Sequence, residues 1–141
     1  RIDRRTYLAR FQLPVDTKYV PLAAEELTER VRSTTRPSDR ILVFGLAANV
    51  YVDAPRVSAS RFFWSRPVVV QFENGRAGYG AAVLLRDLER SAPAIVALQK
   101  HWDTPSPVEF FVSNAPLRRW LENGYTLEED SPQFAVWRRR P

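Results

Sequence analysis

Six side chains that can bind a ligand follow two short apolar runs of the sequence, 41–44 and 94–98. They are Asn49, Tyr51, Arg56, Arg61, His101 and Trp102. Arginine holds a phosphate or a carboxylate through two parallel hydrogen bonds, and ligands of open α/β sheets bind beyond the carboxyl ends of the strands. We therefore take these six residues as ligand-binding candidates. The competing interpretation is that Arg56 and Arg61 pair with local carboxylates such as Asp53.

His101 lies close in sequence to a carboxylate, that of Asp103. A histidine beside a carboxylate can transfer protons near neutral pH. The pair comes without an accompanying nucleophile, so the pattern favours a plain surface loop. We assign no catalytic residue to the chain.

Two turns that contain glycine precede predicted helices, the position at which backbone N–H groups can hold a phosphate. The run 75–80 reads G-R-A-G-Y-G, which has neither the G-x-G-x-x-G spacing nor the Gly-Lys-Ser/Thr ending of a P-loop. The turn after Gly45 has a single glycine. Both patterns favour ordinary turns before helices.

Metal and thiol chemistry find few ligands in this chain, which has one histidine and no cysteine. A zinc cluster built on histidine and a disulfide framework are therefore not expected. The run Glu128-Glu129-Asp130 offers the oxygen ligands that hard cations prefer, although a solvated turn is the favoured interpretation. We predict no metal site and no cofactor.

The formal net charge is +5, and arginines concentrate at both ends of the chain. A basic surface can meet nucleic acid, anionic lipid headgroups or phosphorylated ligands. Few aromatic residues interleave with the arginines, as stacking on bases would require. The pattern therefore favours a solvated or headgroup-facing role of these arginines over nucleic-acid binding.

At 141 residues, the length fits one domain. The polar, arginine-rich stretch 1–19 predicts a lead-in with little structure of its own; the family resemblance described below implies that it lies next to a membrane. Residues 20–141 are predicted to form a single α/β domain. Its centre is the uninterrupted apolar run 41–44, which ends at Gly45 and is typical of a strand buried on both faces.

The other predicted elements alternate between helices and strands. They are helices over 21–33, 81–91 and 116–123, a short helix from about residue 47, strands over 58–64 and 94–98, a strand or extended loop over 68–72, a long loop over 100–114, and a hairpin of 125–129 with 134–138. Gly124 is predicted to end the third helix in a left-handed conformation. The alternation predicts an α/β fold, three-layer and Rossmann-like, with a mostly parallel sheet and a C-terminal antiparallel hairpin.

Several of these segments resemble those of one enzyme family in order and spacing. The stretch 34–45 is similar to T-x-P-x-D-x-I-x-V-x-G, and 56–62 to R-x-x-a-s-R-f. Further likenesses are 49–51, 84–89 with 93–96, 121–125 and 134–138. Over roughly 20–140 the chain resembles the C-terminal domain of bacterial polytopic glycosyltransferases of the C superfamily, relatives of the protein O-mannosyltransferases and lipid A aminoarabinose transferases. It departs from them at Phe44, where tryptophan is common, and over 68–80.

The resemblance implies a domain on the extracytoplasmic face of a bacterial cell membrane, joined to a membrane part of the same polypeptide. Such enzymes transfer a sugar from a polyprenyl-phosphate donor, and their catalytic acidic residues lie in the membrane part. The implied function is therefore non-catalytic: capping the membrane chamber and helping to position the donor or a glycan acceptor. Two alternatives remain, a free-standing Rossmann-like module for a nucleotide or phosphorylated ligand and a basic nucleic-acid module.

Overall fold

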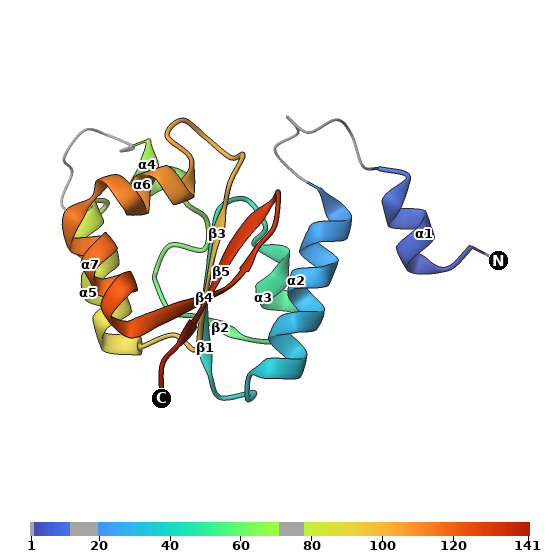
Figure 1. Cartoon of the computed structure of the whole chain (residues 1–141), viewed down its shortest axis with the longest axis horizontal. Coiled ribbons are helices and arrows are strands. Elements are labelled where there is room, and N and C mark those ends of the chain that lie inside the picture. The colour runs from blue at the N-terminus through green and yellow to red at the C-terminus, as the bar shows by residue number, and fades with distance from the viewer. Residues whose placement is uncertain (1, 12–19, 71–77) are drawn as a thin grey trace.

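A computed structural model describes residues 2–11, 20–70 and 78–141. Helices and strands alternate along most of this chain (Figure 1). They are α1 (Arg4–Ala9), α2 (Pro21–Thr34), β1 (Arg40–Phe44), α3 (Asn49–Asp53), β2 (Val57–Ser58), α4 (Arg66–Val69), α5 (Ala81–Ser91), β3 (Ile95–Gln99), α6 (Pro107–Ser113), α7 (Ala115–Gly124), β4 (Tyr125–Asp130) and β5 (Phe134–Arg139).

Among the described residues, five strands form one mixed sheet in the order β2-β1-β3-β5-β4. β1 pairs in parallel with β2 on one side and with β3 on the other. β5 runs antiparallel to both β3 and β4. The predictions of an α/β fold, a parallel centre and a C-terminal antiparallel hairpin are therefore confirmed.

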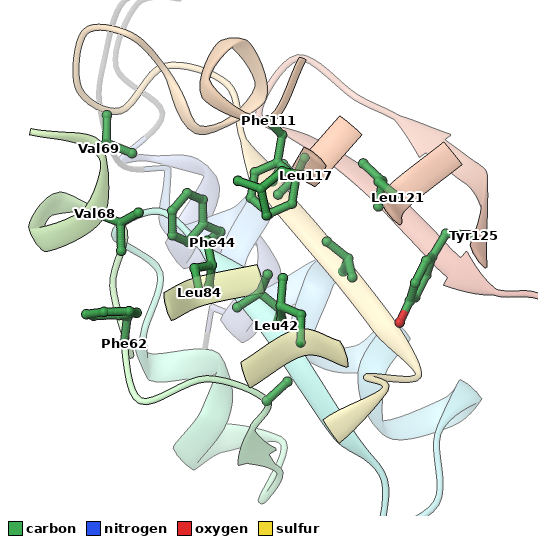
Figure 2. Packing of buried hydrophobic residues seen from close by; sticks show 14 residues of the cluster. Leu42, Phe44, Phe62, Val68, Val69, Leu84, Phe111, Leu117, Leu121 and Tyr125 are labelled. Carbon is green, nitrogen blue, oxygen red and sulfur yellow. The ribbon is translucent and has the colours of Figure 1, made fainter. Parts of the chain in front are cut away.

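The central strand β1 is buried on both faces, as its apolar run predicts. Ile41 and Val43 belong to a cluster with residues of α2 and α3. Leu42 and Phe44 point the other way, into a cluster with residues of α5, α6 and α7 (Figure 2). Helices consequently pack on both faces of the sheet (Figure 1).

The strand predicted over 58–64 is wrong, because β2 has only two residues. Ala59 still donates its N–H to the Ile41 carbonyl at 2.8 Å. The next N–H groups then turn to side chains: Ser60 to Ser58 Oγ (3.2 Å), Arg61 to Asp87 Oδ2 (3.0 Å) and Phe62 to Ser60 Oγ (3.1 Å). Bonded to side chains in this way, the backbone leaves the sheet.

Two other segments form helices that the sequence reasoning did not place. Arg66–Val69 is α4, so the predicted strand or extended loop over 68–72 is wrong where described, and residues 71–77 lie outside the described part. The predicted loop 100–114 contains α6, which starts with a capping box between Ser106 and Glu109. Ser-Pro-Val-Glu is the S-x-x-E signal for such a helix start, and it was overlooked.

The ends of the chain add two further findings. The lead-in includes α1, whose first turn is capped by the Asp3 side chain. Gly124 belongs to α7, and Gly78 is the one described glycine with a positive φ. The predicted left-handed cap at Gly124 is therefore wrong.

Gly45 sits where a side chain has no room. A Cβ placed on it would lie 2.3 Å from Gln99 Oε1 and 2.5 Å from Gln99 Cβ.

Gly45→Ala should lower the free energy of unfolding by about 1–3 kcal/mol, as overpacking of a core does. Gly124→Ala is the matched control, since its added Cβ meets no atom within 4 Å. Alanine inside a helix should stabilise by about 0.5–1 kcal/mol. Urea denaturation measures the free energy of unfolding of both variants. Equal changes in the two variants would contradict the close packing of Gln99 against Gly45.

Candidate functional site

The carboxyl ends of β1 and β3 lie side by side, with Phe44 opposite Leu98. From β1 the chain passes to β2 on one side and later returns to β3 on the other, so this edge is the topological switch point of the sheet. His101 follows β3 at this edge, as the parallel arrangement predicts. Asn49 begins α3 after the β1 turn.

The space above the end of β1 is occupied by the side chain of Gln99. Its Oε1 accepts the Leu46 N–H at 2.7 Å and lies where a Cβ of residue 45 would be. Ser65 also reaches this point, donating its N–H to the Gly45 carbonyl at 3.1 Å. The turn after Gly45 is thus held by protein groups, in keeping with the expected ordinary turn.

Asp103 pairs with Arg66 at this edge, with 3.0 Å between Oδ1 and the Nη1 of the arginine. Its side chain is only 6% exposed. Within the described part of the chain, Asp103 Oδ2 and Ser65 Oγ are buried without a hydrogen-bond partner. His101 is exposed. The Asp103 carboxylate is therefore the ion-pair partner of Arg66, and no histidine–carboxylate pair forms between the described residues.

Tyr51 is a buried partner of the central strand. Its hydroxyl accepts the Val43 N–H at 2.7 Å and donates to the Val43 carbonyl at 3.3 Å. Burial raises the pKa of Tyr51, against smaller lowering effects of hydrogen bonds from Ser58 and Val43. The hydroxyl thus replaces the neighbouring strand where β2 has ended. Asn49, by contrast, is exposed and donates its Nδ2 to Asp53 Oδ2 at 3.1 Å.

Arg56 joins the end of α2 to the end of α3. Its Nε donates to Thr35 Oγ1 at 2.9 Å and its Nη2 to the Thr35 carbonyl at 3.0 Å. Its Nη1 donates to the Ala54 carbonyl at 2.7 Å. The interpretation that Arg56 pairs with a carboxylate such as Asp53 is wrong, because its acceptors are carbonyl and hydroxyl oxygens.

Arg61 does pair with a carboxylate, but a distant one. Its Nε lies 3.0 Å from Asp87 Oδ2 and its Nη2 lies 2.9 Å from Asp87 Oδ1. The Asp87 side chain is only 12% exposed. The hydrogen bond from the Arg61 side chain is the main cause that lowers the pKa of Asp87, and burial opposes it.

Arg61 lines a hollow of about 690 Å³ at the amino ends of β1 and β2. Arg40 and Arg90 line the same hollow. Sequence reasoning missed both: Arg40 immediately precedes the central apolar run, and Arg90 lies on the same helix as Asp87. His101 and Trp102 follow the opposite ends of the strands, so the six predicted residues do not form a single site.

The acidic run near the C-terminus is not a solvated turn. Glu128, Glu129 and Asp130 end strand β4. Arg30 pairs with Glu129 at 2.7 Å, and Lys100 pairs with Asp130. Within the described ranges, no group of three or more acidic or histidine side chains is arranged to hold a metal ion.

The fold defines an α/β protein with a five-stranded mixed sheet in the described residues. Comparison of the chain with protein-family models, curated protein sequences and solved structures gives no match. None of the described helices is both long and apolar enough to cross a bilayer.

Tyr51→Phe should reveal the part that the hydroxyl plays at the edge of β1. Removing it leaves the Val43 N–H and carbonyl without their side-chain partner, and an unsatisfied buried group costs about 1–3 kcal/mol. Tyr7→Phe is the control, because that side chain is 52% exposed. Urea denaturation should show a loss of stability for Tyr51→Phe alone. Equal stability of the two variants would show that water replaces the hydroxyl.

Asp87→Asn should change the pH dependence of stability. The pKa of Asp87 is lowered from its ordinary 3.8 in the folded chain, so its ionised form stabilises folding. This contribution is present above the ordinary value and is lost as the pH falls through the lowered one. The melting midpoint of Asp87→Asn should therefore lie below that of the wild type at pH 7 and approach it as the pH falls below the ordinary value of 3.8.

Glu89→Gln supplies the control for this titration. Glu89 lies on the same helix and is exposed, and no ion pair joins it to another described residue. Its substitution breaks no ion pair between described residues and should change the melting midpoint at pH 7 less than Asp87→Asn does. A parallel pH response of the two variants would refute a specific role of the Arg61–Asp87 pair.

Proposed function

We propose that this chain is a non-catalytic accessory domain of a membrane glycosyltransferase that uses a polyprenyl-phosphate sugar donor. It caps the catalytic chamber of a membrane part of the same polypeptide, on the extracytoplasmic face of a bacterial membrane. There it helps to position the donor or a glycan acceptor.

The observation that supports this proposal most is that residues carrying the family resemblance contact one another in pairs. Thr35 accepts Arg56 at 2.9 Å, and Arg61 holds Asp87. Tyr125 donates its hydroxyl to the Pro93 carbonyl at 2.9 Å.

Each of these pairs joins two segments of the resemblance that are distant in sequence. The segments that carry the resemblance therefore belong to one folded domain, so the proposed relationship concerns the whole domain.

The same relationship would make the fold a Rossmann-like, three-layer variant. Helices α2 and α3 pack on one face of the sheet, and α5, α6 and α7 on the other. The antiparallel pair β4 and β5 replaces the further parallel strands of a larger doubly wound sheet.

A nucleotide module is the weaker candidate. Nucleotides bind such folds at the turn that follows the first strand. Here the Gln99 side chain fills the space beside Gly45. The accessory role needs no opening at that turn, so this contact favours it.

A transfer assay tests the proposal. Membranes that contain the full polypeptide are supplied with a polyprenyl-phosphate-linked sugar, and released polyprenyl phosphate is measured. We expect release from the full polypeptide and none from the 141-residue chain alone. Arg61→Glu should reduce release several-fold, because it places two carboxylates together and lowers the amount of folded domain.

The matched control is the charge swap Arg61→Glu with Asp87→Arg, which restores opposite charges but not the acceptor of the residue 61 N–H, and should therefore recover part of the release. Two results would refute the proposal. One is a parent polypeptide without membrane-spanning segments. The other is a full polypeptide that releases no polyprenyl phosphate from any such donor.

A further inference from the structure

Three arginines from separate elements meet around the hollow at the amino end of the sheet. Arg40 is the first residue of β1, Arg61 lies in the segment after β2, and Arg90 is in the last turn of α5. The hollow measures about 690 Å³. Sites for small ligands typically measure about 300–1,000 Å³, so a small polar group fits.

The guanidinium groups keep free N–H donors. Arg61 uses its Nε and Nη2 for Asp87, which leaves its Nη1. Arg40 donates one bond from its Nη1 to the Ser58 carbonyl at 3.0 Å. The Arg90 residue is exposed, and its side chain makes no hydrogen bond or ion pair with any other described residue.

The charge of the lining is one-sided. Three guanidinium groups face a single carboxylate, that of Asp87, which Arg61 already neutralises. The positive charges of Arg40 and Arg90 are left without a counter-ion among the described residues. An anion with two negative charges would balance them.

The backbone beneath the arginines is held in place by serine hydroxyls. Ser58 Oγ donates to the Ser60 carbonyl at 2.8 Å, and Ser91 Oγ to the Ala59 carbonyl at 2.7 Å. The backbone next to the arginines is thus held by hydrogen bonds, and binding an anion would order only the arginine side chains. A backbone that is already ordered before binding lowers the entropic cost of binding.

We propose that this hollow binds a dianionic phosphate group, a phosphate monoester or a pyrophosphate, between Arg40 and Arg90 with Arg61 on the third side. Forked guanidinium donors match the oxygens of a phosphate better than a point charge does. The group can belong to a soluble compound or to a polyprenyl phosphate. The lipid source alone rests on the proposed function.

Isothermal titration calorimetry of the 141-residue chain tests the site. Inorganic phosphate and pyrophosphate are titrated separately, each at two salt concentrations. We expect saturable binding, with pyrophosphate the tighter ligand. Arg90→Ala should weaken it roughly tenfold, as loss of a hydrogen bond to a charged group does. Arg86→Ala is the matched control: Arg86 is an exposed arginine of the same helix that does not line the hollow. It should change the affinity less than about twofold.

Flotation with neutral vesicles, with and without polyprenyl phosphate, separates the two sources. Binding to polyprenyl-phosphate vesicles that Arg90→Ala weakens by a similar factor supports the site with a lipid ligand. Binding to pyrophosphate alone supports it with a soluble ligand. The proposal is overturned if neither probe binds saturably, or if Arg86→Ala and Arg90→Ala weaken binding equally.

The outcome is separable from that of the proposed function. Phosphate binding that depends on Arg90, in a polypeptide that releases no polyprenyl phosphate, would keep the site and refute the transferase role. Release of polyprenyl phosphate by a polypeptide whose domain binds neither probe would do the reverse.

Discussion

Burial of β1 on both faces is the constraint on which the other contacts of this domain depend. Water cannot reach its peptide groups, so each needs a protein partner. β3 supplies these partners along one side. On the other side β2, Ala59 and finally the Tyr51 hydroxyl supply them in turn. Immediately beyond the strand, Gln99 replaces water at the Leu46 N–H. Much of the surrounding chain is therefore arranged to satisfy the polar groups of one strand.

Local patterns were enough to predict the elements whose structure is decided locally. The apolar runs of β1 and β3 and the helical spacing of α2 and α5 lie within single windows of sequence. The strand predicted over 58–64 is wrong because the backbone N–H groups of this segment bond to side chains. One of these side chains is Asp87, on a helix distant in sequence. Its aromatic residues are typical of a strand, and tertiary contacts overrode that preference. The start of α6, by contrast, is decided locally, because its capping box lies within the four residues 106–109.

The candidate site was less predictable, for a physical reason. Residue type identified the arginines as anion binders but not their partners, since Thr35 and Asp87 lie in other parts of the sequence. Only the folded chain shows that the guanidinium group of Arg56 donates its hydrogen bonds within the protein, largely to backbone carbonyls, whereas those of Arg40 and Arg90 keep free N–H donors. The value of an arginine as a binding group therefore depends on what the fold has left unbonded.

The two margins of the sheet have a consequence for association between molecules. An exposed strand edge can pair with another chain, and short strands, bulges and charges prevent it. At one margin β2 has only two residues. At the other, the pairing of β4 shifts register between Leu127 and Glu129, and the strand carries three consecutive acidic residues. Among the described strands, neither margin offers a long, flat template. Pairing of two molecules through these strand edges is therefore disfavoured.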